Sequence, residues 1–265
     1  MLLAIDIGNS DITLGLHIEN QWQPVWRIPS VADLPQMFYS LKILDNFFES
    51  GIKREDVSCV VISSVVPELT DKIVYASASL FEIDPIVMGP ELYKSLPITV
   101  LNPYEIGSDL VSNSLAAFTF FNRSCVVVDF GTALTFTTLS GKGEILGVSI
   151  APGLKTAIKS LSQNTARLFD VPLDMPESVL GKGTVQAIQA GVLIGYEGMV
   201  RHMLERIKSE LNDPSLSTVA TGGLSSIIPS LKEVFSVVDP HLTLNGLKIA
   251  GEIVMGKAQA IAERK

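Results

Sequence analysis

Two short segments of the chain place an aspartate after a run of apolar residues and shortly before a glycine. They are Asp6-Ile7-Gly8-Asn9-Ser10 and Asp129-Phe130-Gly131-Thr132-Ala133. Glycine lets phosphate oxygens approach main-chain N–H groups, and the small polar residues add hydrogen-bond donors. Because a carboxylate at the same turn would repel phosphate, we expect a cation between the two. An ordinary β-turn has similar residue preferences and would explain one copy better, but two copies at equivalent places favour phosphate binding.

A third carboxylate of interest is Asp109, which lies within Ile106-Gly107-Ser108-Asp109-Leu110. It begins an expected helix that runs to Phe121. In phosphoryl transfer, which mainly needs its reactants positioned, such a carboxylate would accept the proton of a hydroxyl nucleophile. An acid in the first turn of a helix also stabilises that helix by about 0.3–1 kcal/mol through the helix dipole. The sequence alone does not separate these two interpretations.

Other familiar chemistries have little support in this sequence. The segment Gly181-Lys182-Gly183-Thr184 is not a Walker A motif, because the required first glycine is missing and Gly183 separates Lys from Thr. The three histidines are scattered along the chain, which gives little support to a zinc site or a Ser-His-Asp triad.

Composition limits the class of protein. The 265 residues are 47% hydrophobic and 18% charged, which suggests one large or two smaller domains with a substantial core. With 28 acidic and 20 basic residues, the net charge of −8 argues against a nucleic-acid or anionic-membrane surface, although ATP remains compatible with it. Cys59 and Cys125 lie in apolar runs and are expected to be buried free thiols. With no signal peptide or membrane span evident, we expect a cytoplasmic protein.

The elements that must position these residues alternate between strands and helices in the first half of the chain. Apolar residues 2–6 predict a strand that ends at the first turn, and alternation over residues 12–18 predicts a returning strand. Further expected elements are strands at 22–28, 57–62 and 86–88, and helices at 34–48 and 68–81. This alternation predicts an α/β layered fold.

The second half begins by repeating the first. Residues 125–129 form an apolar run before the second turn, and a returning strand leads to a hairpin turn at 141–143. The repetition predicts duplicated halves that face one another across a cleft, which we place at residues 1–121 and 122–265. The remainder is expected to be mostly helical, with helices near 153–168, 184–211 and 247–262. Glycines 191, 195 and 198 inside the second of these predict close approach of another helix, within the chain or across a dimer.

Together these motifs resemble the type III pantothenate kinases, members of the actin/hexokinase/Hsp70-like superfamily of ATP-using folds. The resemblance runs nearly end to end and is carried by Asp6–Ser10, Ser64–Pro67, Gly107–Asp109, Asp129–Ala133, Ile150–Gly153, Gly181–Thr184 and Thr221–Gly223. The two Asp-x-Gly turns are shared by the whole superfamily, whereas their combination with Gly-x-Asp and Gly-Lys-x-Thr is more specific. The resemblance implies two duplicated ribonuclease-H-like (actin-like ATPase) domains, each a mixed sheet flanked by helices, with a cleft between them.

The resemblance also implies an activity: ATP-dependent phosphorylation of pantothenate to 4'-phosphopantothenate, the first step of coenzyme A biosynthesis. It implies ATP contacts at Asp6, Ile7, Gly8, Asn9, Ser10, Asp11, Ile12, Thr13 and Thr132. It implies pantothenate contacts at Gly107, Ser108, Asp109, Leu110 and, from across a homodimer interface, Thr184. Asp109 would be the proton acceptor, and Asp129 would hold a monovalent cation, K⁺ or NH₄⁺. Mg²⁺ would accompany ATP.

The sequence departs from the family pattern at several places. Leu110 stands where the family usually has an arginine that would pair with the substrate carboxylate. Hydrogen bonds to charged groups contribute about 1.5–3 kcal/mol, so its loss would weaken binding by roughly one to two decades. The segment Glu91-Leu92-Tyr93-Lys94-Ser95, Thr137 and Val148 also depart from the pattern. We expect a working kinase. The alternatives are a non-catalytic nucleotide-binding regulator and a kinase of the same superfamily acting on another small hydroxylated acid.

Overall fold

The computed structural model describes residues 1–262, and these residues divide into two compact units. The first unit comprises Met1–Thr119 together with the residues from His241 onward, and the second comprises Phe120–Pro240. The expected boundary near residue 121 lies close to the first junction. The structure differs at the second junction, because it assigns the C-terminal helix to the first unit, whereas the sequence analysis placed it in the second domain.

The first unit contains a mixed five-stranded sheet with the strand order β3-β2-β1-β4-β5. The strands are β1 Leu2–Ile7, β2 Asp11–Ile18, β3 Gln21–Pro29, β4 Cys59–Ser64 and β5 Ile86–Val87. The central strand β1 is antiparallel to β2 and parallel to β4. This arrangement puts Asp6 opposite Thr13 on one side and opposite Ser63 on the other.

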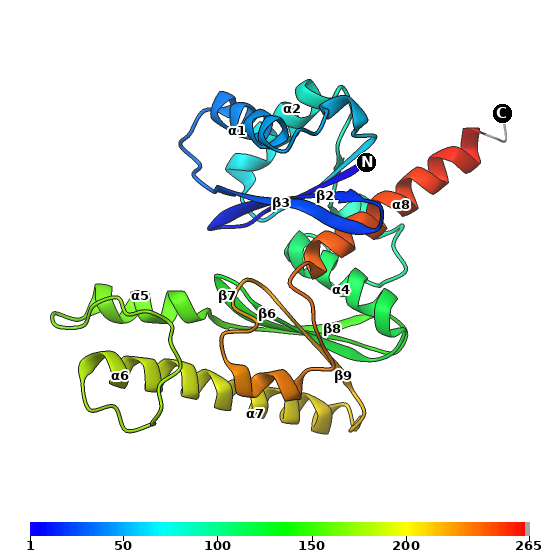
Figure 1. The fold of residues 1–265 in the computed structure, drawn as a ribbon. Helices are drawn as coiled ribbons and strands as arrows, with labels where there is room; N and C mark the ends of the chain where they lie inside the picture. Colours follow the sequence, from blue (N-terminus) through cyan, green and yellow to red (C-terminus); the bar gives the residue numbers. More distant parts are fainter. Residues whose placement is uncertain (263–265) are drawn as a thin grey trace. The chain divides into compact units, whose positions relative to one another are not determined.

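Helices cover both faces of this sheet (Figure 1). On one face lie α1 (Gln36–Glu49) and α2 (Pro67–Phe81), whose apolar residues pack against buried side chains of β1 and β2. On the other face lie α8 (Leu242–Ala262), which contacts β1 and β4, and α4 (Ser108–Phe121). Two short helices, η1 (Arg54–Asp56) and α3 (Pro90–Tyr93), lie in the connections.

Specific contacts explain why α8 belongs to the first unit. The indole Nε1 of Trp22 donates a hydrogen bond of 2.7 Å to Asn245 Oδ1, and Thr243 Oγ1 donates one of 2.8 Å to Asn113 Oδ1. Gly246 lies so close to the main chain of Ser112 that any side chain there would collide with it. An apolar helical pattern predicts that a helix buries one face, but it does not tell which sheet receives that face.

The second unit repeats this sheet, with the strand order β10-β9-β6-β7-β8. The strands are β6 Cys125–Phe130, β7 Ala133–Leu139, β8 Ile145–Pro152, β9 Ser217–Thr221 and β10 Val237–Val238. Its central strand β6 is antiparallel to β7 and parallel to β9, as β1 is to β2 and β4. The predicted fold class of two duplicated mixed sheets flanked by helices is therefore confirmed.

The helices of the second unit are α5 (Leu154–Asn164), α6 (Thr184–Gln189), α7 (Gly195–Glu210) and the short 3-10 helix η3 (Pro229–Val234). A π-helical segment, η2 (Ala190–Ile194), joins α6 to α7, so the predicted long helix is present with an interruption. An ideal Cβ at Gly191, Gly195 or Gly198 would contact no described atom within 4 Å. The expectation that another element of the same chain approaches these glycines therefore gains no support from the described residues.

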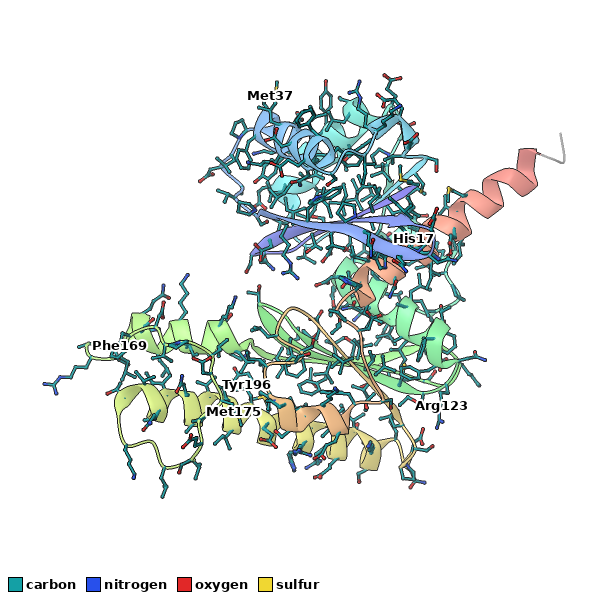
Figure 2. The ribbon with its side chains drawn as sticks, viewed as in Figure 1. His17, Met37, Arg123, Phe169, Met175 and Tyr196 are labelled. Atoms are coloured by element: carbon teal, nitrogen blue, oxygen red, sulfur yellow. The ribbon has the colours of Figure 1, made fainter. Side chains whose placement is uncertain are left out.

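Tyr196 of α7 links the helices of the second unit to its sheet by a hydrogen bond. Its hydroxyl donates a hydrogen bond of 2.6 Å to the carbonyl oxygen of Pro152, where β8 ends (Figure 2). The core beneath combines β6 and β7 side chains with apolar residues of α5, η2 and α7. Among all described helices, none has both the length and the apolar composition needed to cross a membrane.

Candidate functional site

The first Asp-x-Gly turn joins β1 to β2. The N–H of Gly8 donates a hydrogen bond of 3.0 Å to the carbonyl oxygen of Asp11, which closes the turn. The side chains of Asn9, Ser10 and Asp11 are exposed. Those of Ile7 and Ile12 are buried in the core, so these two residues hold the turn in place and offer a ligand only their main chain. The turn therefore presents main-chain and small polar groups at its surface, as phosphate binding requires.

The second Asp-x-Gly turn joins β6 to β7, and the start of α5 fixes its shape. The N–H of Gly131 donates a hydrogen bond of 3.1 Å to the carbonyl oxygen of Ala133. The carbonyl oxygen of Thr132 accepts hydrogen bonds from Gly153 N at 3.0 Å and from Thr156 Oγ1 at 2.7 Å. A Cβ at Gly153 would collide with the carbonyl oxygens of Gly131 and Thr132. This glycine therefore permits the close contact, while the Thr132 side chain stays exposed.

Asp6 and Asp129 occupy equivalent positions in the two sheets. Asp6 lies opposite Thr13 on the antiparallel neighbour and Ser63 on the parallel neighbour. Asp129 lies opposite Thr135 and Thr221 in the same way. Both aspartates are the second-last residue of a central strand and are half-buried. The structure thus confirms that the sequence repeat is one structural device used twice.

The surroundings of Asp129 supply oxygen atoms. Gly222, which follows β9, has a φ of +89°, and a Cβ there would crowd Asp129 Oδ1 and the main chain of Phe130. Only glycine therefore lets this turn lie so close to the carboxylate. In the described part of the chain, no three His, Cys, Asp or Glu side chains form a group that could hold a metal ion. A carboxylate oxygen is a ligand that suits a hard cation rather than a transition metal.

Asp109 lies in the first turn of α4. Its Oδ1 accepts a hydrogen bond of 2.8 Å from the N–H of Leu110. Burial raises the pKa of the carboxyl group above its ordinary value, although hydrogen bonds from the main chain of Leu110 and Asp109 oppose this shift. A Cβ at Gly107 would collide with Oδ1, so the glycine leaves room for the carboxylate to fold back over the helix end. A raised pKa brings a carboxylate closer to the value that suits a general base at neutral pH.

The neighbouring residues of the Gly107–Leu110 segment have different surroundings. The hydroxyl of Ser108 points to the end of β4, where it lies 2.9 Å from Ser63 Oγ. The side chain of Leu110 is buried, with only 9% of its surface exposed. An apolar side chain in this position offers no charge to a substrate carboxylate.

Tyr93 is a buried phenol that the sequence analysis did not assign to the site. It ends α3 and is 5% exposed. Burial raises the pKa of its phenol to about 12, and the negative charge of Asp109 adds to the shift. The charge of the Asp109 carboxylate therefore acts on this phenol. No periodic pattern in the sequence links the two residues, since the long connection between them contains no predicted element.

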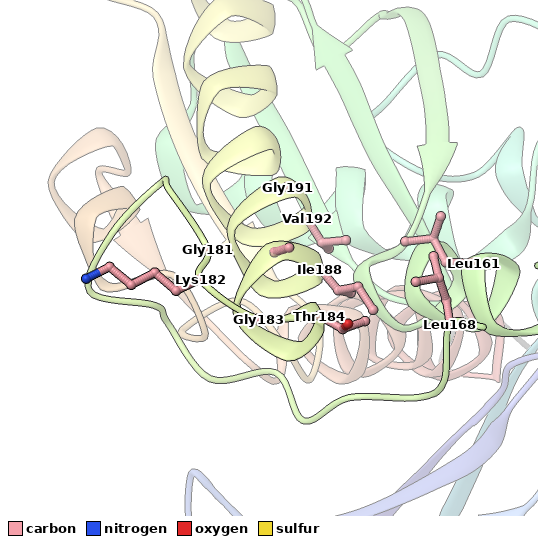
Figure 3. A pocket seen from close by; sticks show the side chains of 10 residues that line it. Leu161, Leu168, Gly181, Lys182, Gly183, Thr184, Ile188, Gly191 and Val192 are labelled. Carbon is pink, nitrogen blue, oxygen red and sulfur yellow. The ribbon is translucent and has the colours of Figure 1, made fainter.

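Thr184 belongs to the second unit and begins α6. It is exposed and lies on a pocket of about 600 Å³, together with Lys182 and apolar residues of α5, α6 and η2 (Figure 3). Leu161, Leu168, Ile188 and Val192 form the apolar wall, whereas the ammonium group of Lys182 points away from it (Figure 3). The pocket therefore has an apolar wall with one hydroxyl at its edge.

Known proteins resemble this chain both in sequence and in fold. A family model described as type III pantothenate kinase matches residues 2–206. A protein of Treponema pallidum (strain Nichols) named type III pantothenate kinase is 43% identical over 96% of this chain and 94% of its own length. A protein of the same name from Anaeromyxobacter dehalogenans is 40% identical over 95% and 99%. The structure of MreB 5 of Spiroplasma citri bound to AMPPNP is 9% identical, with a TM-score of 0.56 over 98% of both chains, which shows a shared fold alone.

Proposed function

This chain belongs to the type III pantothenate kinase family, and from that premise we propose that it transfers the terminal phosphoryl group of ATP to pantothenate. The products are 4'-phosphopantothenate and ADP, and the reaction is the first step of coenzyme A biosynthesis. The observation that carries the proposal is the Asp109 carboxylate, half-buried at the start of α4 with its pKa raised by burial. Because the proposed reaction is an ATP-dependent step of metabolism, we also place the protein in the cytoplasm.

Asp109 acts as the proton acceptor. As the pantothenate hydroxyl oxygen forms its bond to the terminal phosphorus, the bond from that phosphorus to the ADP oxygen breaks, and the hydroxyl proton passes to Asp109. Residues 6–13 of the first turn and Thr132 of the second bind ATP, and Asn9 and Ser10 are exposed as that role requires. Mg²⁺ bound with ATP supplies positive charge to the phosphates.

Asp129 holds a monovalent cation, K⁺ or NH₄⁺. The support is the donor set, in which the carboxylate lies next to the main chain of Phe130 and to a glycine whose Cβ would fill the space. If Asp129 binds such an ion, replacing K⁺ by Na⁺ in the assay lowers the rate of the native enzyme. The same replacement leaves the residual rate of an Asp129→Asn variant unchanged.

Pantothenate binds at Gly107–Leu110, where Ser108 offers only its main chain because its hydroxyl is bonded to Ser63 and Ser64. Thr184 contacts pantothenate from the second chain of a homodimer, which agrees with its exposure at the edge of an apolar pocket. Mixing an Asp109→Asn chain with a Thr184→Ala chain tests this arrangement. In a dimer that shares its sites, the mixture regains activity that neither variant has alone, whereas independent monomers show only the sum of the two.

A substrate panel read by coupled ADP release tests the proposed activity. Purified protein with Mg²⁺-ATP and K⁺ should release ADP when pantothenate is added, and much less with other small hydroxylated acids. ATP binding without ADP release from any acceptor would identify a non-catalytic regulator and overturn the proposal.

Leu110 favours a second candidate, a kinase of the same fold that acts on another small hydroxylated acceptor. Its buried apolar side chain gives no partner to the pantothenate carboxylate. Comparing pantothenate with its neutral primary-alcohol analogue separates the two candidates. A clear preference for pantothenate shows that another group recognises the carboxylate. A preference for a different acceptor in the panel supports the second candidate.

A further inference from the structure

The hydroxyl of Ser108 is completely engaged by the end of β4. It accepts a hydrogen bond of 2.9 Å from the N–H of Ser64 and donates one of 2.9 Å to the carbonyl oxygen of the same residue. Its third partner is Ser63 Oγ, also at 2.9 Å. A serine hydroxyl has one proton and two lone pairs, so these three contacts use its full capacity when Ser63 donates. Ser108 and Ser63 are both buried, at 5% and 0% exposure.

These contacts join the first phosphate turn to the helix that carries Asp109. Ser63 lies opposite Asp6 in the sheet, and the N–H of Val65 donates a hydrogen bond of 3.0 Å to the carbonyl oxygen of Ile7. The end of β4 is therefore bonded to the first turn on one side and to Ser108 on the other. Asp109 is the next residue along α4, and all of these groups belong to the first unit.

Two further hydrogen bonds at this helix end lie within α4 itself, whereas α8 packs against α4 one turn further along, at Ser112 and Asn113. The bond from Leu110 N–H to the carboxylate of the preceding residue and the bond from Ser112 Oγ to the carbonyl oxygen of Ser108 both lie within the helix. They would move with the helix if it shifted. Gly107, which precedes it, has no side chain to hold it.

We propose that Ser108 is a positioning residue, which fixes the distance between the first phosphate turn and the Asp109 carboxylate. This inference rests on the proposed kinase reaction, in which Asp109 must reach the hydroxyl while the turn holds ATP. Ser108 then acts through Asp109, and its hydroxyl makes no contact with pantothenate. A displacement of about 1 Å in such a site lowers a rate by up to about a hundredfold.

The test compares Ser108→Ala with Ser77→Ala. Ser77 is a matched control because it is fully buried on α2 of the same unit and its hydroxyl has no hydrogen-bond partner among the described residues. We expect Ser108→Ala to lower kcat by about tenfold to a hundredfold, with KM for ATP and for pantothenate within about twofold of the native values. Ser77→Ala should leave kcat unchanged.

The dependence of kcat on pH gives a second measurement. It would stay unchanged if Ser108 only stabilised the fold. The described titratable group on which the Asp109 charge acts is Tyr93, which remains uncharged below about pH 10. A helix end released from β4 exposes the carboxylate to water, so the acidic limb of the kcat profile moves to lower pH in Ser108→Ala. If Ser108→Ala does not fold, Ser63→Ala removes one of the three contacts and should shift kcat and the profile in the same direction by less.

Three outcomes would overturn the inference. An increase in KM for pantothenate at unchanged kcat would mean that the hydroxyl contacts the substrate. Unchanged kcat and an unchanged profile, with only a lower Tm, would mean that Ser108 stabilises the fold alone. A Ser63→Ala variant as active as Ser77→Ala would exclude the link through β4. If the native enzyme itself releases no ADP with pantothenate, the proposed function fails instead.

Discussion

At the scale of single residues, Asp109 serves the helix and the proposed reaction with the same carboxylate. It accepts a hydrogen bond from the N–H of Leu110, which stabilises the start of α4, and burial raises its pKa. The sequence left these two roles as alternatives. The geometry makes them compatible, because the carboxylate uses Oδ1 for the helix and has a second oxygen atom.

Replacing Asp109 by Asn separates the two roles. The amide oxygen can still accept from Leu110 N–H, so the fold and ATP binding should persist. The amide cannot accept the substrate proton, and kcat should fall by about 10²–10⁴-fold. Steady-state kinetics, thermal unfolding and nucleotide titration on the same preparation measure these effects. A matching loss of Tm and of activity would show that the carboxylate serves the helix alone.

The same substitution has a pH-dependent effect on stability. A carboxyl group whose pKa is raised by folding binds more protons in the folded state than in the unfolded state. Its contribution to the free energy of unfolding therefore declines as the pH rises from the ordinary pKa of Asp through the raised pKa of the folded state. Above that window the native protein carries the full cost of a buried charge. Asp109→Asn should therefore be at least as stable as the native protein at pH 7. Denaturant titrations of both proteins at pH 4 and pH 7 would show how the difference between their free energies of unfolding changes with pH.

The sequence predicted individual residues only where a motif surrounds them. Asp109 and both turn aspartates stand out because glycines and apolar strands flank them. The hydrogen bond between Ser108 and Ser63 joins segments that lie far apart along the chain. Such pairings depend on how β4 and α4 meet, and no local pattern encodes that meeting.

At the scale of elements, the second turn depends on the junction of β8 and α5. Gly153 and Thr156 both donate hydrogen bonds to the Thr132 carbonyl oxygen, so the start of α5 holds the turn from outside. The strands of the first unit, the strands β6 and β7 and most of the longer helices were predicted within a few residues, because their apolar periodicity is strong, whereas β8 and β10 were not predicted. The π-helical segment η2 was not predicted, since a single extra residue in a helical turn leaves no clear signal in the pattern.

Gly153→Ala should disturb the second turn specifically. Its Cβ would collide with the carbonyl oxygens of Gly131 and Thr132, so the turn must shift, at a cost of about 1–3 kcal/mol in stability. We expect KM for ATP to rise while KM for pantothenate changes little. Gly147→Ala is the matched control, because Gly147 lies on β8, the strand that ends just before Gly153, with no described atom within 4 Å of its Cβ. Equal kinetics in the two variants would exclude this role for the β8–α5 junction.

At the scale of the whole molecule, the first unit is built from two separate parts of the chain. The sequence predicted the duplication and the first junction, since repeated motifs and strand patterns mark both. The membership of α8 was not predictable in this way, because it depends on contacts of Trp22 and Ser112 with residues more than a hundred positions away.

Two glycines of α8 allow a controlled test of this packing. A Cβ at Gly246 would collide with the main chain of Ser112, and Gly246→Ala should lower the free energy of unfolding by about 1–3 kcal/mol. Gly256 has no described atom within 4 Å of its Cβ, and Gly256→Ala should be neutral or stabilising by up to about 1 kcal/mol. Denaturant unfolding of both variants measures the difference. A stable Gly246→Ala protein would contradict the close packing of α8 on α4.

The split of the first unit also sets an order of events during synthesis on the ribosome. The second unit is one continuous segment, so all of its strands and helices have been translated once residue 240 has left the exit tunnel. The first unit, although translated earlier, still lacks the helix that covers one face of its sheet at that moment. The second unit can thus complete its core first, while the face of β1 and β4 that α8 covers stays uncovered until α8 has been translated.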